Sequence, residues 1–294
     1  AGTRPDAACK PRRCGMSADI TKLPSANGQS VTGKDDWQPL RQYTRARIGL
    51  ARSGNTLKTP DVLEFQAAHA QARDAVHTPL DVACMEQAMA GAPFLRVNSR
   101  APDRSTYLRR PDFGRRLSEE SRAALPKGAW DVVFVAADGL SSTATQQGAV
   151  PLFEAMRERL TDWQIAPLVV ATQARVALGD EIAQTMGAGM VVVMIGERPG
   201  LSVADSMGVY LTYAPYVGCA DSSRNCLSNI HPHGLSVQAA ADKLAWLMRE
   251  ARHLPSTGVG LKDAAPESAA HGHVDRLSHM TVVFASGWPA DPSQ

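Results

Sequence analysis

The sequence has few cysteines and no paired cysteine motif. The five cysteines form an odd-numbered, scattered set over 294 residues: Cys9, Cys14, Cys84, Cys219 and Cys226. Small secreted scaffolds show dense, even-numbered cysteine frameworks, so this pattern suits a protein of the reducing cytoplasm. The absence of any CxxC pair argues against a structural zinc site.

Long apolar runs and the common ligand-binding signatures are also missing. No segment approaches the ~18 apolar residues that a membrane helix needs, and the basic residues 1–15 lack the apolar centre of a signal peptide. The motifs GxGxxG, GxxxxGK[ST] and GxSxG do not occur. A dinucleotide fingerprint, a P-loop and a nucleophile elbow are therefore excluded. The net charge of +2 argues neither for nor against nucleic-acid binding.

What is present is enough apolar sequence for a core, with 44% hydrophobic and 20% charged residues. Residues 1–35 are polar and rich in Gly, Pro, Ser and Lys, which predicts a disordered or loosely ordered arm. We expect a helical N-terminal region over 36–128 and an α/β domain over 129–263. The tail over 264–294 gives no clear structural signal, apart from a candidate strand near residues 281–285.

The best helix signal in the N-terminal region is Thr59-Pro60-Asp61, with a hydroxyl cap, a proline in the first turn and an acid near the positive end of the helix dipole. We expect this helix to run to about Val76 and to bury one face, which would include Val62 and Phe65. Ser118 before two glutamates predicts the cap of a later helix.

After Trp130, apolar strands alternate with helices. The expected strands are 132–136, 167–171, 190–195 and 209–213, and the expected helices are 149–160, 179–186 and one that begins at Ser236. Such alternation predicts an α/β fold in which a parallel sheet has helices on both faces. The segment Arg224-Asn225-Cys226-Leu227-Ser228-Asn229 is expected to be a loop.

Three loops should meet at one edge of this sheet, because the carboxyl ends of parallel strands lie together and ligands bind there. They are ADGLSS from Ala137, TQARV from Thr172 and GERPG from Gly196. Asp138 and Asp180 are candidate general bases, although an aspartate in such a place is more often a cap or a loop hydrogen-bonder.

The remaining polar candidates do not add catalytic machinery. The pairs His231/His233 and His271/His273 have no evident third ligand at helical spacing for a metal. We assign no catalytic residue and no metal ligand to this chain. The sequence thus predicts a ligand-binding edge without its own catalytic groups.

The segments GERPGL, DSMGVYLTY and RNCLSNI, together with YLRRPDFGRRL and RVALGDEIAQTMGA, resemble the small subunit of ethanolamine ammonia-lyase. The resemblance covers about residues 37–263. It implies a Rossmann-like domain that holds adenosylcobalamin against a larger (β/α)₈-barrel subunit. In that family a radical mechanism converts ethanolamine to acetaldehyde and ammonia, and the cofactor carries the chemistry.

The resemblance places the family's cobalamin contacts on Val176, Glu197 and Cys226. A Glu197 carboxylate can accept N–H groups from the corrin amides, and the other two side chains would give compact apolar contact. The alternative for Glu197 is a structural ion pair, for example with Arg198. No DxHxxG motif is present, which agrees with base-on cobalamin whose cobalt takes no protein ligand. Ala174 stands where glycine is expected, and its methyl group could restrict the approach of the corrin.

The implied partner is the large subunit, in a higher-order hetero-oligomer, without nucleic acid or membrane. This chain would be inactive alone and cytoplasmic, with enclosure in a bacterial microcompartment left open. Two alternatives stay open at this point. One is a non-catalytic assembly or microcompartment-associated protein that has lost cofactor binding, and the other is a self-sufficient Rossmann-type enzyme for another small ligand.

Overall fold

The computed structural model describes residues 37–44, 46–50 and 52–264 of the chain. The predicted arm over 1–35 and nearly all of the predicted tail over 264–294 lie outside these ranges. So do the pair His271/His273 and the candidate strand near residues 281–285. The account below concerns the described residues only.

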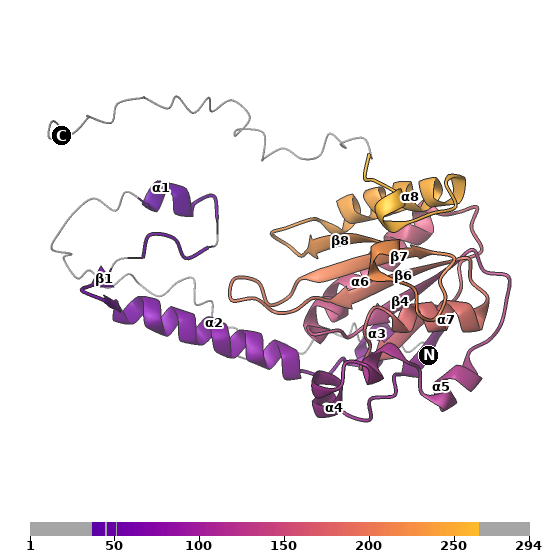
Figure 1. The fold of residues 1–294 in the computed structure, drawn as a ribbon, viewed down its shortest axis with the longest axis horizontal. Helices are drawn as coiled ribbons and strands as arrows, with labels where there is room; N and C mark the ends of the chain where they lie inside the picture. Colours follow the sequence, from indigo (N-terminus) through magenta and orange to yellow (C-terminus); the bar gives the residue numbers. More distant parts are fainter. Residues whose placement is uncertain (1–36, 45, 51, 265–294) are drawn as a thin grey trace, which may run out of the picture.

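The centre of the fold is a six-stranded sheet with the order β3-β5-β4-β6-β7-β8 (Figure 1). Its strands are β3 (Phe94–Asn98), β4 (Val132–Ala137), β5 (Leu168–Thr172), β6 (Met190–Gly196), β7 (Met207–Tyr213) and β8 (Arg224–Ile230). Strands β3, β5, β4 and β6 are parallel, whereas β7 and β8 add to the β6 side as antiparallel strands. The α/β class is confirmed, and the sheet is mixed rather than wholly parallel.

Helices cover both faces of this sheet, as the alternation of the sequence predicts. The helices are α1 (Gln38–Arg41), α2 (Thr59–His77), α3 (Val82–Ala88), α4 (Arg104–Arg109), α5 (Glu119–Ala124), α6 (Ser142–Arg159), α7 (Leu178–Met186) and α8 (Val237–His253). Every residue of β4 and β6 is buried, which explains their continuous apolar runs. One core lies under α3, α6 and α8, and the second lies under α7 on the opposite face.

Two strands of the sheet were not predicted. The expected loop RNCLSN is strand β8, which pairs antiparallel with β7. Only Arg224 and Ile230 of β8 are buried, so the segment lacks the apolar run that marks a central strand. Strand β3 was missed in the region expected to be helical, because it is a short edge strand with partly exposed residues.

Helix α6 begins seven residues earlier than predicted, at Ser142. Its first half is polar or small in sequence, and Pro151 inside it is normally a sign of a helix end. Burial of Ala144, Thr145 and Ala149 against the sheet stabilises the helix there despite the missing N–H of Pro151. Tertiary packing therefore overrides local propensity in this element.

Helix α2 confirms the predicted extent but not the predicted buried face. It spans Thr59–His77, is preceded by Lys58 without a side-chain cap, and contains no buried residue. Phe65 is 45% exposed. The helix extends away from the sheet (Figure 1). Near its carboxyl end, Arg104 donates to the carbonyl of Val76 at 2.8 Å. The apolar spacing of α2 is thus only partly covered within the described chain, where Val62 and Ala72 are half-buried and Phe65 is exposed.

The other predicted helix starts are confirmed. Ser118 accepts from the backbone N–H of Ser121 at the start of α5, and Ser236 accepts from that of Ala239 at the start of α8. A two-stranded ribbon, β1 (Arg52–Ser53) and β2 (Thr56–Leu57), precedes α2. Among the described residues, none of the helices combines the length and the apolar character that a membrane span requires.

Candidate functional site

The three loops that follow β4, β5 and β6 meet at one edge of the sheet, as predicted. The carboxylate of Asp138 accepts from the backbone N–H groups of Gln173 at 2.8 Å and Ala174 at 2.9 Å. The N–H of Leu140 donates to the carbonyl of Gly196 at 2.9 Å. ADGLSS therefore joins both TQARV and GERPG, although the three loops are far apart in sequence.

Asp138 holds these loops together by hydrogen bonds and is not an exposed general base. Its side chain is 4% exposed and forms an ion pair with Arg104 at 3.2 Å. Burial raises the pKa of this carboxyl, while the two loop N–H groups and Arg104 favour its ionised form. The next residue, Gly139, has a φ of +56° and packs against Gly196. A Cβ at Gly139 would lie 2.2 Å from the carbonyl of Gly196, so only glycine fits there. The structural interpretation of Asp138 is confirmed.

Asp180 is also structural. It makes a two-pronged ion pair with Arg224, with distances of 2.6 Å and 2.7 Å. Both side chains are almost fully buried, at 2% exposed for Arg224 and 1% for Asp180. Arg224 also donates to the hydroxyl of Thr212 and to the carbonyl of Cys219, each at 3.0 Å. This pair fixes the loop before β8 to the first turn of α7.

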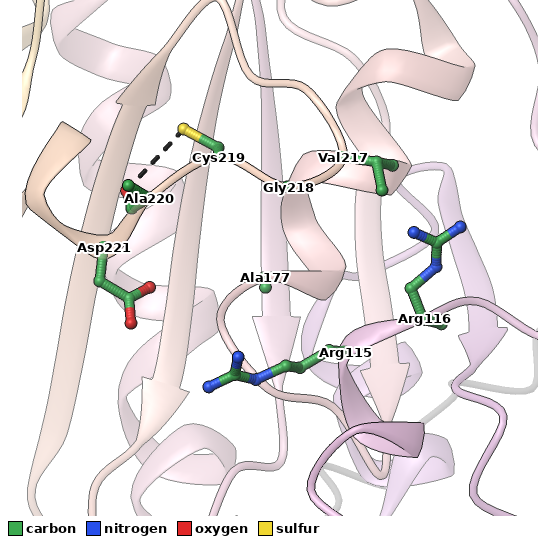
Figure 2. A pocket seen from close by; sticks show the side chains of 8 residues that line it. All are labelled: Arg115, Arg116, Ala177, Val217, Gly218, Cys219, Ala220 and Asp221. Atoms are coloured by element: carbon green, nitrogen blue, oxygen red, sulfur yellow. Dashed lines mark hydrogen bonds between the residues drawn. The ribbon is translucent and has the colours of Figure 1, made fainter.

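A pocket of about 370 Å³ lies where α7 begins. Its lining comes from four parts of the chain: Pro111, Arg115, Arg175, Val176, Ala177, Tyr210 and Asp221. An adjoining pocket of about 340 Å³ shares Arg115, Ala177 and Asp221 and continues along residues 217–220 (Figure 2). Val176 is thus placed beside a hollow in the surface, next to the start of α7.

Glu197 lies beside β7 and β8. Its Oε2 accepts from the hydroxyl of Ser206 and from the backbone N–H of Asn229, the latter at 3.4 Å. A β-bulge at this point of β8 turns Asn229 to a φ of +65°. Among the ion pairs of the described residues, none joins Glu197 to Arg198, so the predicted alternative for Glu197 is not observed. Oε1 accepts no hydrogen bond within this part of the chain.

Cys226 lies on β8 directly opposite Tyr210 on β7, and the two side chains share a hydrogen bond. Burial, the neighbouring Cys226 and the charge of Glu197 raise the pKa of Tyr210 to about 12. Partial burial and the negative charge of Glu197 also raise the pKa of the Cys226 thiol, against the hydrogen bond from Tyr210. At neutral pH both groups are therefore protonated and uncharged.

Tyr210 links the three residues that the sequence singles out. Tyr210 lines the same pocket as Val176 and lies opposite Cys226 in the strand pair. The negative charge of Glu197 contributes to the raised pKa of Tyr210. Cys226 is exposed and Glu197 is half-buried. The structure thus places Val176, Glu197 and Cys226 on one surface, formed by β7, β8 and the start of α7.

The expected obstacle at Ala174 is absent. The residue is fully buried, and its methyl group packs in the core under α7 rather than facing the pocket. Its N–H donates to Asp138, and its carbonyl accepts from the hydroxyl of Tyr107 at 3.0 Å. The methyl group therefore does not narrow the pocket.

The described residues contain no group of three or more His, Cys, Asp or Glu side chains that could hold a metal ion. His231 is engaged locally, since its Nε2 lies 2.8 Å from the side-chain oxygen of Asn229 and its Nδ1 accepts from the N–H of His233 at 3.2 Å. Among these residues, the alternative of a metal site at this histidine pair finds no support.

Sequence reasoning missed Tyr210, Arg115 and Arg175 as pocket residues. The arginine-rich turn over 109–116 was visible, but its position beside α7 depends on the hydrogen bond from the N–H of Arg175 to the carbonyl of Gly114, at 2.8 Å. Gly114 allows this approach, because a Cβ there would lie 2.9 Å from the ring of Tyr107. Nothing local in the sequence shows that contact.

The chain is similar to one well-defined group of proteins. The family model described as "Ethanolamine ammonia-lyase light chain (EutC)" matches residues 34–262. A protein of Azotobacter vinelandii named ethanolamine ammonia-lyase small subunit is 47% identical over 254 residues, which cover 83% of this chain and 94% of that protein. Proteins of the same name from Ralstonia nicotianae and Pseudomonas aeruginosa (strain UCBPP-PA14) are 49% and 46% identical. These alignments cover 79% and 86% of this chain, and 90% and 96% of the relatives.

Proposed function

The chain belongs to the ethanolamine ammonia-lyase light-chain family, and from this premise we propose that it holds adenosylcobalamin against a larger catalytic subunit. It is a lyase subunit, and its role is to bind and orient the cofactor. When bound, adenosylcobalamin supplies the radical chemistry that converts ethanolamine to acetaldehyde and ammonia. This chain supplies the surface on which the cofactor rests.

The observation that carries the proposal is the common surface of Val176, Glu197 and Cys226 around Tyr210. Glu197 would accept N–H groups from the corrin amides through Oε1, because Oε2 is already held by Ser206 and Asn229. The neutral Cys226 thiol and the Val176 side chain offer compact contact that does not repel an apolar ring system.

The size of the pocket supports a site shared with a partner. Pockets of roughly 300–1,000 Å³ enclose drug-sized ligands, and adenosylcobalamin is several times larger than those. The hollow of about 370 Å³ beside Val176 can therefore take only part of the cofactor. The remainder would lie over β7 and β8 and be enclosed by the large subunit.

The N-terminal region also fits dependence on the large subunit. Helix α2 has no buried residue in 19, and Leu63 and Phe65 on it are 58% and 45% exposed. A helix of this kind gains most of its stability from packing, which this part of the chain does not provide. We place the complex in the cytoplasm as a higher-order hetero-oligomer.

The test is reconstitution with a candidate large subunit. Both chains are co-expressed, and ethanolamine-dependent release of acetaldehyde is assayed with added adenosylcobalamin. We expect turnover only when both chains and the cofactor are present. A stable complex without turnover and without bound cobalamin would favour a scaffold that has lost its site. Turnover by this chain alone would favour a self-sufficient enzyme.

A further inference from the structure

Two arginines of the pocket beside α7 have no carboxylate partner among the described residues. Arg115 is exposed, and its guanidinium points to the side of the adjoining pocket on which Asp221 lies (Figure 2). Arg175 lies on the ring of Tyr107, with 4.4 Å between its guanidinium carbon and the ring centre. The Nε of Arg175 is buried and makes no hydrogen bond within this part of the chain. A buried donor without an acceptor is costly, so a ligand that supplies an acceptor to this guanidinium would be favoured.

Several neighbouring arginines have carboxylate partners, which Arg115 and Arg175 lack among the described residues, although Nη2 of Arg104 is also buried without a hydrogen bond there. Arg104 pairs with Asp138, Arg224 pairs with Asp180, and both Arg116 and Arg122 pair with Glu181. Arg115 and Arg175 are left to face the pocket.

The pocket is therefore electropositive. Its one acidic lining residue, Asp221, is already in contact with the Nε of Arg224 at 3.3 Å. Helix α7 begins here without a side-chain cap, and its positive dipole end adds to the two guanidinium groups. In the described part of the chain, the backbone N–H groups of Val176 and Ala177 have no hydrogen-bond acceptor. Donors of both kinds thus converge on one hollow, as in sites that bind phosphate groups.

We propose that this pocket is the subsite for the phosphodiester of the cobalamin nucleotide tail, bound by Arg115 and Arg175; this rests on the proposed function. The corrin side chains of adenosylcobalamin are neutral amides, and its phosphodiester is the one anionic group of the molecule. Guanidinium forks match phosphate oxygens in geometry as well as charge. Val176 and Tyr210 line the same pocket, so the phosphate and the corrin contacts lie within the reach of one ligand.

The arrangement is preorganised, which favours specific binding over a diffuse charge effect. Tyr107 is buried and carries Arg104 on its ring as well as Arg175, at 4.8 Å and 4.4 Å. Its hydroxyl is tied to the carbonyl of Ala174. Arg175 is therefore held by stacking before a ligand arrives, and less side-chain entropy is lost on binding.

The test compares two ligands that differ only by the phosphate, adenosylcobinamide phosphate and adenosylcobinamide. Their dissociation constants are measured on the assembled complex of this chain with the large subunit. We expect the wild type to prefer the phosphate form, and Arg115→Met to reduce that preference about tenfold, the effect of losing one charge-assisted hydrogen bond. Arg175→Met should do the same. Arg157→Met is the control, because Arg157 lies on α6, away from the pocket lining, and its contacts among the described residues are with Glu154 and the ring of Phe153.

The outcomes separate this subsite from the proposed function. If Arg115→Met weakens both ligands equally, or weakens subunit assembly and not the phosphate preference, the pocket serves a carboxylate of the partner and the subsite is overturned. In that case cobalamin binding itself still stands. If the wild-type complex binds no cobamide at all, the proposed function fails and the subsite with it. Arg115 is exposed and unpaired, so its variant should fold normally even if Arg175→Met does not.

Discussion

The two faces of the sheet are built in different ways. The face under α3, α6 and α8 is closed and apolar, with side chains such as Phe134, Leu244 and Met248 fully buried. Ion pairs on this side, such as Arg159–Asp242 and Lys243–Asp263, lie at the surface. Burial of apolar area is non-directional, so this face stabilises the sheet without fixing the position of any one loop.

The face under α7 holds its loops by buried charge. Asp138, Asp180 and Glu181 are at most 5% exposed in their side chains, and each pairs with arginine. Directional pairs of this kind fix geometry, and here they fix the segments that line the pocket. The same face leaves Cys226 exposed and Glu197 half-covered. The comparison indicates that both faces contribute an apolar core, and that the face under α7 adds buried ion pairs that position a binding surface.

The largest effect should come from breaking the Asp180–Arg224 pair. Asp180→Leu leaves the buried guanidinium of Arg224 with only the exposed Asp221 as a counter-charge, and we expect a loss of about 3–5 kcal/mol in the free energy of unfolding. Urea denaturation of the assembled protein and of the chain alone measures it. Glu86→Leu, which breaks the exposed pair with Arg96, should change stability little.

The double variant Asp180→Leu/Arg224→Met sharpens this test. Removing both charges should recover most of the lost stability, since no uncompensated charge remains. The loop before β8 would still lose its anchor, so the double variant should bind cobalamin less well than the wild type. Full recovery of both stability and affinity would contradict the positioning role of this pair.

Truncation of the closed face should affect stability without affecting the site. Leu244→Ala removes a buried side chain of α8 and should lower the free energy of unfolding by about 2–5 kcal/mol. At temperatures where the variant remains folded, its cobalamin affinity in the complex should match that of the wild type. A comparable loss of affinity would show that the two faces are not separable. Val259→Ala, at an 83% exposed position, is the control.

The smallest effect concerns the titration of Cys226. Its raised pKa means that the thiolate forms only above the ordinary range of a thiol, so alkylation should reach half its limiting rate at a correspondingly high pH. Glu197→Gln removes one cause of that shift and should lower the midpoint. The measurement is the pH dependence of alkylation in a variant where Cys226 is the sole cysteine. An unchanged midpoint in Glu197→Gln would separate Glu197 from the thiol.

Much of the fold could be predicted from the sequence, because β4, β5, β6 and α8 carry clear apolar patterns. The meeting of the three loops followed from the rule for parallel strands. The antiparallel direction of β7 and the presence of β8 did not follow from that rule. Strand β8 has no apolar face in its sequence, and only Arg224 and Ile230 of it are buried. The apolar spacing of α2 predicted a buried face, but the described chain covers that face only in part and buries none of its residues fully.

The site was predictable only where a motif carried it. Val176, Glu197 and Cys226 came from the resemblance, and the structure brings them to one surface. Tyr210, Arg115 and Arg175 were missed because their role depends on cross-strand register and on the approach of Gly114 to Tyr107. Register and loop contact are properties of the folded chain, so no local pattern reports them.

The most direct test of the binding surface is the dissociation constant of adenosylcobalamin from the assembled complex carrying Glu197→Gln. The amide keeps the shape of the side chain but loses the charged acceptor. We predict a loss of ~1–3 kcal/mol in binding free energy, with subunit assembly unchanged and with Glu86→Gln equal to the wild type. An unchanged dissociation constant in Glu197→Gln would contradict a cofactor contact at Glu197. The residue would then have only the structural role of its hydrogen bonds to Ser206 and Asn229.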